Sequence, residues 1–283
     1  MKFSLWTQYG ALNSQPVFSA FKKGAENLGY ECALNDHNSD IDVIWSVLFH
    51  GRMTGNKAIW DRAKAKNKNV IVLEVGGIKR GTTWKVGLNG INRDAYFGEL
   101  GNSSDRANSL NLSCKPWRRH GDYVLICGQH DKSLQWNAMP RMSSWVIDII
   151  EQVQRFTTRP ILFRPHPRCP LHDIEHQFKN VFRQNPNKML NSYDDYDLSF
   201  AQAHAVISHS SNPGPQAILA GVPAFVSTSS LAYEAANDID FLHDIEEPIM
   251  PDRQQWLNDY AYTEYTIEEI AQGIPLKNLT LKL

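Results

Sequence analysis

The chain has 283 residues, of which 29 are basic and 30 acidic, and its formal net charge is -1. The length suits one large domain or two modest ones. The balanced charge excludes a general electrostatic attraction to nucleic acid or to a membrane surface, so any anionic partner must be held by a local patch. No apolar run approaches the roughly 20 residues that span a bilayer.

The first residues and the cysteines point to a cytoplasmic protein without a dedicated metal site. The start, MKFSLWTQYG, has only a short apolar run, which favours a strand over a signal peptide. The four cysteines show no CxxC pair and no zinc-finger spacing, a pattern typical of reduced, structural thiols in an intracellular protein: Cys32, Cys114, Cys127 and Cys169. No cluster of carboxylates indicates a metal, and we expect no dedicated metal site. We therefore expect a soluble cytoplasmic protein with no membrane partner.

Strands and helices alternate along the first part of the chain. Apolar runs predict strands at KFSLWT, YECAL, DVIWSVLF and NVIVLEVG, and the last two are apolar enough to be buried on both faces. Amphipathic patterns predict helices at PVFSAFKKGAENLG, which stops at Gly29, and at NKAIWDRAKAKN. Alternation of this kind favours a parallel, doubly wound sheet.

A long passage without clear periodicity follows, from GIKRGTTWKVGLNG to SCKPWRRHGD. It is rich in Gly, Asn and Ser and is far longer than an ordinary connection, which predicts an irregular functional or linker segment. We place a domain boundary in its second part, near Lys115.

The alternation then starts again. Strands are predicted at DYVLICGQH, RPILFRPHP and AVIS, and helices at MPRMSSWVIDIIEQVQRF, at LHDIEHQFKN, within LSFAQAHA and at TIEEIAQGI. The stretch AVISHSSNPGPQAILAGVPAFV has the order strand, polar turn, helix, Gly221 stop, strand. The expected architecture is therefore two Rossmann-like domains with parallel sheets that face a central cleft. Their boundaries are 1–115 and 116–255, and a helical segment 256–283 packs back on the first domain.

Polar residues follow three strands of the second half, in CGQHDK, FRPHPR and SHSSNPG. In open α/β sheets ligands bind beyond the carboxyl ends of the strands, so these residues converge if the strands are neighbours. The free N–H groups and dipole of the helix after SHSSNPG attract phosphate. Arg164 can bind phosphate oxygens with two N–H groups, and His166 can donate a hydrogen bond. The alternative is that HSSNPG is an ordinary N-cap and turn, and RPHP a rigid loop exit.

Two common nucleotide motifs are missing. The chain has no GxGxxG fingerprint of dinucleotide oxidoreductases and no GxxxxGK[ST] loop of P-loop kinases. These two classes of nucleotide-binding protein are therefore excluded.

A strand ending in HP, followed by SHSS and ILAGVPAFV, resembles the nucleotide-binding half of GT-B glycosyltransferases. The likeness is greatest to the bacterial capsule and sialyltransferase-like group, and YVLICGQ is similar to the first strand of that half. The late WLNDYAYTEYTIEEIAQG is similar to the tail of small phage-encoded proteins of this group. The motifs cover Tyr123 to Gly273, whereas the first half is similar only in layout.

The resemblance implies a nucleotide-sugar co-substrate, a UDP-sugar favoured, and no tightly bound cofactor. The residues it implies for donor binding are Gly128, Gln129, Arg164, His166, Ser210, Ser211, Gly214 and Glu234. Glu234 would be the carboxylate for ribose or sugar hydroxyls. The usual E-x-x-A-x-G spacing is replaced by PQAILAG, with Gln216 where an acid is common, which puts that contact in doubt.

In an inverting transferase of this architecture the first half binds the acceptor and supplies a carboxylate base. Glu74, at the end of a buried strand and before two glycines, is the first candidate, and Asp36, beside His37, is the reserve. The alternative interpretation is that Glu74 is an ordinary surface glutamate at the start of a loop. Basic residues around an aromatic ring can bind a nucleic-acid backbone and stack on a base, or form an ordinary solvated loop. These acceptor-binding candidates are His50, Arg52, Lys79, Arg80, Trp84 and Lys85.

The leading hypothesis is thus a glycosyltransferase whose acceptor is a hydroxymethylated pyrimidine in double-stranded phage DNA, flipped out of the duplex, in the host cytoplasm. The near-neutral charge counts against this acceptor. Transfer to a capsule or other cell-surface glycan is the first alternative. A non-catalytic nucleotide-sugar-binding protein and a nucleotide-sugar epimerase are the others.

Overall fold

The structure is a computed structural model that describes residues 1–188, 196–197 and 199–283. The chain divides into two compact units. The first unit comprises Met1–Leu110, Lys132–Leu134 and Asn258–Leu283, and the second comprises Asn111–Asp131 and Gln135–Leu257. The C-terminal segment therefore folds as part of the first unit.

The sheet of the first unit has six strands in the order β14-β5-β4-β3-β1-β2. Strands β1 to β4 pair in parallel, whereas β5 is antiparallel to both β4 and β14. The strands are β1 (Lys2–Leu5), β2 (Glu31–Leu34), β3 (Ile41–Trp45), β4 (Val70–Val75), β5 (Thr83–Leu88) and β14 (Glu264–Thr266). The expected parallel sheet is thus confirmed in its core and extended by an antiparallel pair.

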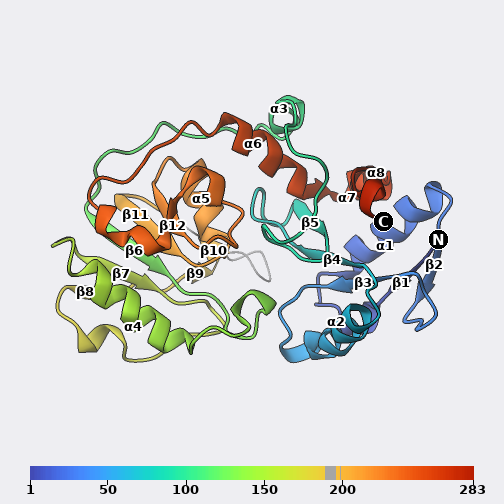
Figure 1. The fold of residues 1–283 in the computed structure, drawn as a ribbon, viewed down its shortest axis with the longest axis horizontal. Coiled ribbons are helices and arrows are strands. Elements are labelled where there is room, and N and C mark those ends of the chain that lie inside the picture. The colour runs from blue at the N-terminus through green and yellow to red at the C-terminus, as the bar shows by residue number, and fades with distance from the viewer. Residues whose placement is uncertain (189–195, 198) are drawn as a thin grey trace. The chain divides into compact units, whose positions relative to one another are not determined.

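Helices cover both faces of this sheet (Figure 1). Apolar residues of α1, α7 and α8 pack on one face with Phe3, Trp45 and Leu73, and those of α2 pack on the other with Ile44 and Val72. The helices are α1 (Gln15–Asn27), α2 (Asn56–Ala65), α3 (Asp105–Ser109), α7 (Ile267–Ala271) and α8 (Ile274–Leu279), with 3-10 turns η1 (Thr7–Tyr9), η2 (Gly51–Gly55), η7 (Ala261–Thr263) and η8 (Thr280–Lys282).

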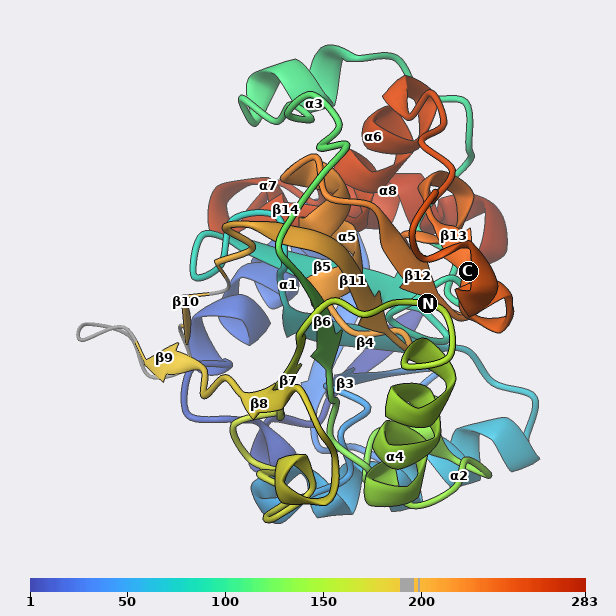
Figure 2. The same ribbon diagram turned by 90° about the vertical axis from the view of Figure 1, so that its left-hand side faces the viewer.

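The second unit has a fully parallel six-stranded sheet in the order β13-β12-β11-β6-β7-β8 (Figure 2). Its strands are β6 (Tyr123–Cys127), β7 (Ile161–Arg164), β8 (Val181–Arg183), β11 (Ala203–Ser208), β12 (Ala224–Val226) and β13 (Asn237–Asp238). A separate antiparallel pair joins β9 (Asn187–Lys188) to β10 (Tyr196–Asp197).

Helices also lie on both faces of the second sheet. Helix α4 packs on the face of Ile126, Phe163 and Ile207, and α5 contacts β11 and β12 from the other face. The elements are α4 (Met142–Val153), α5 (Pro213–Leu219), η3 (Leu134–Trp136), η4 (Glu175–Gln177), η5 (Tyr233–Ala235) and η6 (Ile239–Asp244). Helix α6 (Gln254–Tyr260) contains the boundary between the units, because Asn258 and the residues after it belong to the first. Among the described residues, no helix combines the length and apolar character needed to cross a bilayer.

Three expectations about local structure were wrong. The passage after NVIVLEVG is not irregular throughout, because Thr83–Leu88 forms β5 and Asp105–Ser109 forms α3. The helix expected at LHDIEHQFKN is only the turn η4, since Leu171 and Asp173 adopt φ values of 47° and 63°, which a right-handed helix does not allow. No helix precedes β11 within the described part of LSFAQAHA, where residues 201–202 form a turn.

Gly221 and Gly29 end helices in the left-handed conformation, as the sequence predicts, with φ of 75° and 80°. A Cβ at Gly221 would lie 2.1 Å from the backbone oxygen of Pro116, whereas at Gly29 it would have no atom within 4 Å. We expect G221A to lower the free energy of unfolding by at least about 3 kcal/mol, and the matched G29A by about 1–2 kcal/mol. Denaturant unfolding of both variants tests this, and equal losses would contradict the clash at Gly221.

A buried ion pair joins α3 to α7. Arg106, whose side chain is 7 % exposed, donates to Glu269 Oε1 at 2.5 Å and Oε2 at 2.9 Å, and to the carbonyl of Ala261 at 2.7 Å. Burial alone would raise the pKa of Glu269, but the hydrogen bonds from Arg106 and from the Thr266 N–H outweigh it and lower that pKa.

Because the pKa of Glu269 is lower in the folded state, its contribution to stability is present above the unfolded value of about 4.3 and is lost as the pH falls through the folded value. E269Q should lower the free energy of unfolding at pH 7 by about 3–5 kcal/mol, since it leaves the Arg106 charge buried. Unfolding followed from pH 7 to pH 2 should also show a weaker pH dependence in E269Q. An unchanged acid profile would contradict this role.

Candidate functional site

The polar ends of β6, β7 and β11 lie next to one another in the second sheet. The register aligns Ser208 with Cys127, and Cys127 with Arg164, so the residues after these three begin at the same edge. Parallel strands present their carboxyl ends together, and this edge is where α/β sheets bind ligands. The structure therefore brings CGQHDK, FRPHPR and SHSSNPG together.

Gln129 links the ends of β6 and β11. Its side chain is 6 % exposed, and its Oε1 accepts hydrogen bonds from the Ser210 N–H at 3.2 Å and the Ser210 Oγ at 3.3 Å. Two of the predicted donor residues are thus bonded to each other. This pairing fixes the path of the chain into the SHSSNPG turn.

Ser211, the next residue, differs from Ser210. Its Oγ is buried and has no hydrogen-bond partner among the described residues. A buried hydroxyl without a partner is unfavourable unless a ligand or water completes it. Ser211 is also not a helix cap, because no side chain caps α5.

The expectation of free N–H groups at the start of α5 was wrong. Pro213 and Pro215 have no N–H, and the Gly214 N–H donates to the Ser211 carbonyl at 3.1 Å. A Cβ at Gly214 would lie 3.1 Å from both Ser208 Oγ and Val226 Cγ1, so this glycine allows the helix to approach the sheet closely. The first turn of α5 itself therefore offers no free N–H group to an anion.

Arg164 is mainly bonded within the protein. The side chain, 4 % exposed, donates from Nε to Gln184 Oε1 at 2.8 Å and from Nη2 to the Ser199 carbonyl at 2.6 Å, and it lies over the ring of Phe200. Only Nη1 lacks a hydrogen-bond partner among the described residues. Arg164 was expected to bind phosphate oxygens with two N–H groups. In the structure its Nε and Nη2 instead bond to the protein and join β7 to Gln184 and to the segment before β11.

Histidines surround the same edge. Half-buried His166 follows β7, and its Nδ1 accepts the Arg168 N–H at 3.1 Å, which leaves Nε2 as the protonated nitrogen of the neutral ring. The ring of His130, 6 % exposed, lies 5.5 Å from that of His166. His209 lies 5.0 Å from the ring of Trp136, and burial lowers the pKa of His209. His130 and His209 were not among the predicted site residues, although both stand inside the quoted motifs.

The two remaining predicted donor residues lie at the same end of the sheet. Gly128 continues β6, and its N–H donates to the Arg164 carbonyl at 2.9 Å. Glu234 is exposed in η5, after β12. Neither position tests the ribose contact suggested for Glu234, which stays a prediction.

In the first unit, Glu74 lies at the carboxyl end of β4 and is half-buried. Its Oε1 accepts the N–H of Val75 at 2.7 Å. In the ladder Glu74 is directly opposite Lys85 of β5. Glu74 is thus a carboxylate at the carboxyl end of its strand, and its cross-strand neighbour Lys85 is buried.

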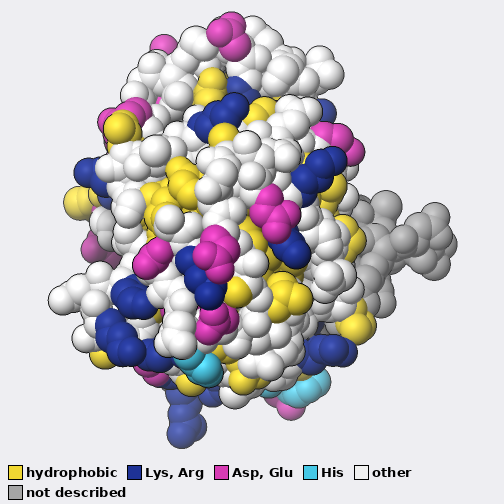
Figure 3. Space-filling model, turned by 90° about the vertical axis from the view of Figure 1, so that its right-hand side faces the viewer, with side chains coloured by type: hydrophobic (Ala, Val, Ile, Leu, Met, Phe, Trp, Pro, Cys, Tyr) yellow, Lys and Arg dark blue, Asp and Glu magenta, His cyan; other side chains and the backbone are white. Residues whose placement is uncertain are grey.

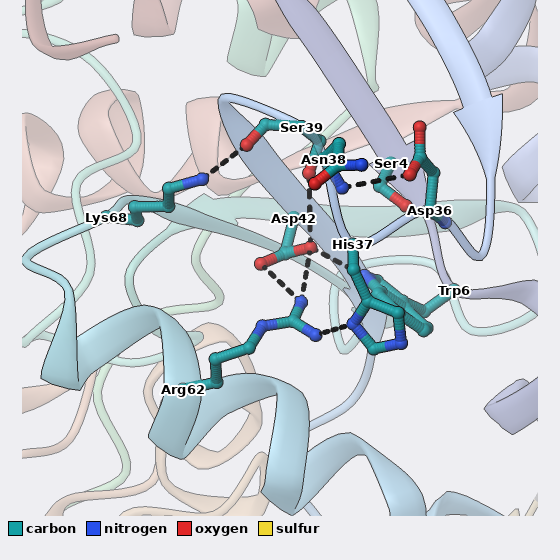
Figure 4. Close-up of polar contacts among 9 residues, drawn as sticks. All are labelled: Ser4, Trp6, Asp36, His37, Asn38, Ser39, Asp42, Arg62 and Lys68. Atoms are coloured by element: carbon teal, nitrogen blue, oxygen red, sulfur yellow. Dashed lines mark hydrogen bonds and ion pairs between the residues drawn. The ribbon is translucent and has the colours of Figure 1, made fainter.

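Asp36, the reserve candidate, is part of a surface ion pair with Lys2. Lys2 Nζ lies 2.7 Å from its carboxylate and lowers the pKa of Asp36. Its neighbour His37 contacts Arg62, which bonds both oxygens of buried Asp42 at 3.1 Å (Figure 4). Asp36 and His37 therefore have structural partners that account for them.

The predicted acceptor residues do not form one surface loop. His50 and Arg52 are exposed after β3, and Lys79 and Arg80 are partly exposed between β4 and β5. Trp84 and Lys85 lie in β5 and are only 8 % and 2 % exposed. The expectation that Trp84 and Lys85 lie with Lys79 and Arg80 in an exposed loop was wrong, because strand pairing buries Trp84 and Lys85 in β5. Among the described residues, no three His, Cys, Asp or Glu side chains gather as metal ligands.

Comparisons with known proteins agree on the fold. No protein-family model and no curated protein sequence matches the chain. It is similar in structure to the KpsC beta Kdo 2,7 transferase of Thermosulfurimonas dismutans, with a TM-score of 0.51 and 14% sequence identity. This match covers 98% of this chain and 100% of that chain. It is also similar to the KpsC beta Kdo 2,4 transferase of the same organism, with a TM-score of 0.51, 11% identity, and 93% and 90% covered. The expected GT-B fold, with two α/β units built on mostly parallel six-stranded sheets, is confirmed.

Proposed function

We propose that this chain is a glycosyltransferase that moves a sugar from a nucleotide-activated donor to a hydroxyl group of a glycan. The observation that carries the donor site is the buried Ser211 hydroxyl, which has no partner among the residues that the structure describes, at the carboxyl edge where Gln129, His130 and His166 also lie. Hydroxyl and imidazole groups there supply hydrogen-bond donors for a diphosphate or a nucleotide. The fold shared with two Kdo transferases supports the same activity.

In the proposed reaction Glu74 acts as the general base. Its carboxylate would take the proton from the acceptor hydroxyl as the oxygen attacks the anomeric carbon of the donor, and the bond from that carbon to the nucleotide's phosphate oxygen breaks. The donor residues of the second unit would stabilise the negative charge on the leaving nucleotide. Glu234 remains the proposed contact for the ribose or sugar hydroxyls.

A glycan is favoured over DNA as the acceptor. The two structural neighbours are, by their names, Kdo transferases, which act on a sugar. Trp84 and Lys85, proposed above to contact DNA, are buried. On the face that Figure 3 draws, basic side chains are interspersed with acidic ones rather than gathered in one patch. A DNA-binding surface needs such a patch, because phosphate contacts supply most of its affinity.

A thermal-shift screen tests the donor site. The purified protein is heated with UDP, UDP-sugars, CMP-sugars, GDP-sugars, NAD and an activated form of Kdo. A ligand at a hundredfold excess over its dissociation constant adds about 2.7 kcal/mol of stability. Selective stabilisation by one nucleotide family supports the proposal and tests the preference for UDP. No stabilisation by any nucleotide would contradict it.

The acceptor is tested next with the donor so identified. Transfer of labelled sugar is measured to short Kdo-containing saccharides and to duplex DNA that carries hydroxymethylated pyrimidines. Transfer to the saccharide supports the glycan acceptor, and salt-sensitive transfer to the duplex would overturn it in favour of DNA. Donor binding without transfer to either would favour a non-catalytic binding protein.

A further inference from the structure

Three charged residues form a row across the antiparallel strands of the first unit. The register places Glu74 of β4 opposite Lys85 of β5, and Lys85 opposite Glu264 of β14. Directly opposite residues project from the same face of a sheet, with Cβ atoms about 4.5–5.5 Å apart. Lys85 therefore lies between two carboxylates, one of which is the proposed base.

The carboxylate of Glu264, at one end of this row, is fully buried and held by several hydrogen bonds. Glu264 is 0 % exposed, and its carboxylate accepts the Gly77 N–H at 2.6 Å, the Ile78 N–H at 2.9 Å and the Thr83 Oγ1 at 2.7 Å. These bonds hold the turn that follows Glu74. Lys85 is 2 % exposed, and its cation has an opposite charge on each side.

Glu74 of β4 is at the opposite end of the row from Glu264. It is half-buried, while its two neighbours are fully buried. A buried charge keeps a fixed position when it is paired, and a fixed cation beside a carboxylate favours its ionised form. A general base must be ionised and held in place before it accepts a proton.

We propose that Lys85 is a positioning residue that holds the Glu74 carboxylate ionised and in place at the end of β4, with Glu264 anchoring the lysine from the other side. This inference rests on the proposed role of Glu74 as the base. Burial lowers the pKa of Lys85, and the charges of Glu264 and Glu74 oppose that effect. Tyr260, whose pKa burial raises, and Arg106, which donates to the Glu264 carbonyl, are further titratable groups beside this row.

A direct measurement of the Glu74 carboxyl tests this without a known acceptor. The side-chain carboxyl carbons of glutamate are labelled with ¹³C, the Glu74 signal is assigned by its loss in E74Q, and its titration is followed by NMR. Because K85M alone would leave Glu264 charged and unpaired in the interior, the comparison is K85M/E264Q against E264Q, which differ only at Lys85.

Glu74 should titrate at least about one pH unit higher in K85M/E264Q than in E264Q, which is a tenfold change in its proton affinity. K85R, which keeps the charge, should titrate close to the unchanged protein. Equal titration of Glu74 in K85M/E264Q and E264Q would overturn the proposal. It would leave Lys85 as a residue that only balances Glu264.

The transfer rate separates this proposal from the proposed function. If Glu74 is the base, the acidic limb of the kcat profile should move with its titration, to higher pH in K85M/E264Q. A shifted Glu74 titration in a protein without transferase activity would refute the catalytic function and leave the electrostatic link between the two residues. A shifted titration with an unmoved acidic limb would show that Glu74 is not the base, and would overturn the positioning role.

Discussion

E74Q should lower kcat for sugar transfer by about 10²–10⁴-fold, the usual contribution of a general base. Glutamine has nearly the same size as glutamate but cannot accept the proton of the acceptor hydroxyl. Donor binding should be unchanged, because Glu74 lies in the first unit and the donor residues lie in the second. Steady-state transfer with the donor found in the screen measures the first effect, and the thermal shift with the same donor measures the second.

D36N is the matched control for this variant. Asp36 is also a carboxylate that follows a strand of the first sheet, but it is paired with Lys2 at 2.7 Å. Its neutralisation should leave kcat within a few-fold of the unchanged protein. If D36N abolishes transfer and E74Q does not, the roles assigned to the two carboxylates are reversed. If neither does, the base is a different residue.

S211A should weaken binding of the nucleotide about 10- to 100-fold, since hydrogen bonds to charged groups contribute about 1.5–3 kcal/mol. The free energy of unfolding should change by less than about 0.5 kcal/mol, because the Ser211 hydroxyl makes no bond to the described protein that would be lost. Calorimetric titration with the selected nucleotide and denaturant unfolding measure the two quantities on the same sample.

S144A serves as the control, since Ser144 is an exposed serine on α4 of the same unit. It should change neither affinity nor stability. A cap or a structural hydroxyl at position 211 would show the opposite pattern, with stability lost and affinity kept. That result would remove the observation on which the donor site depends.

The central elements of both sheets could be predicted because their signals are local. The buried runs of β3, β4, β6 and β11 contain several consecutive apolar residues, and α1 and α4 have apolar residues at helical spacing. Gly29 and Gly221 mark helix ends because few other residues adopt a positive φ without strain.

The antiparallel edge of the first sheet could not be predicted in the same way. β5 alternates Trp84, Val86 and Leu88 with more polar or small residues, but this short alternation lies in a passage rich in Gly and Asn, and it does not indicate that both faces, Lys85 included, are buried. Its partner β14 lies near the other end of the chain. Only the pairing of β5 with β14 places Glu264 opposite Lys85. The charge of Glu264 lowers the cost of burying the lysine at that position.

The convergence of the three polar strand ends was predicted, whereas their bonding was not. Motifs at the ends of three strands indicated one shared edge, because parallel strands place their carboxyl ends together. Whether each polar side chain is available to a ligand depends on residues that meet only in the folded protein. Gln129 bonds Ser210, and Gln184 bonds Arg164, while Ser211 next to them has no partner among the described residues.

The sequence by itself therefore determined the class of fold, two α/β halves, and the strand ends where chemistry is possible, because burial patterns and turn residues act over a few neighbouring positions. The tertiary structure decided which of those residues are committed to the protein and which remain for a ligand. It did so because hydrogen bonds and ion pairs, such as that between Arg106 and Glu269, join segments far apart in the chain. No local pattern records such partners.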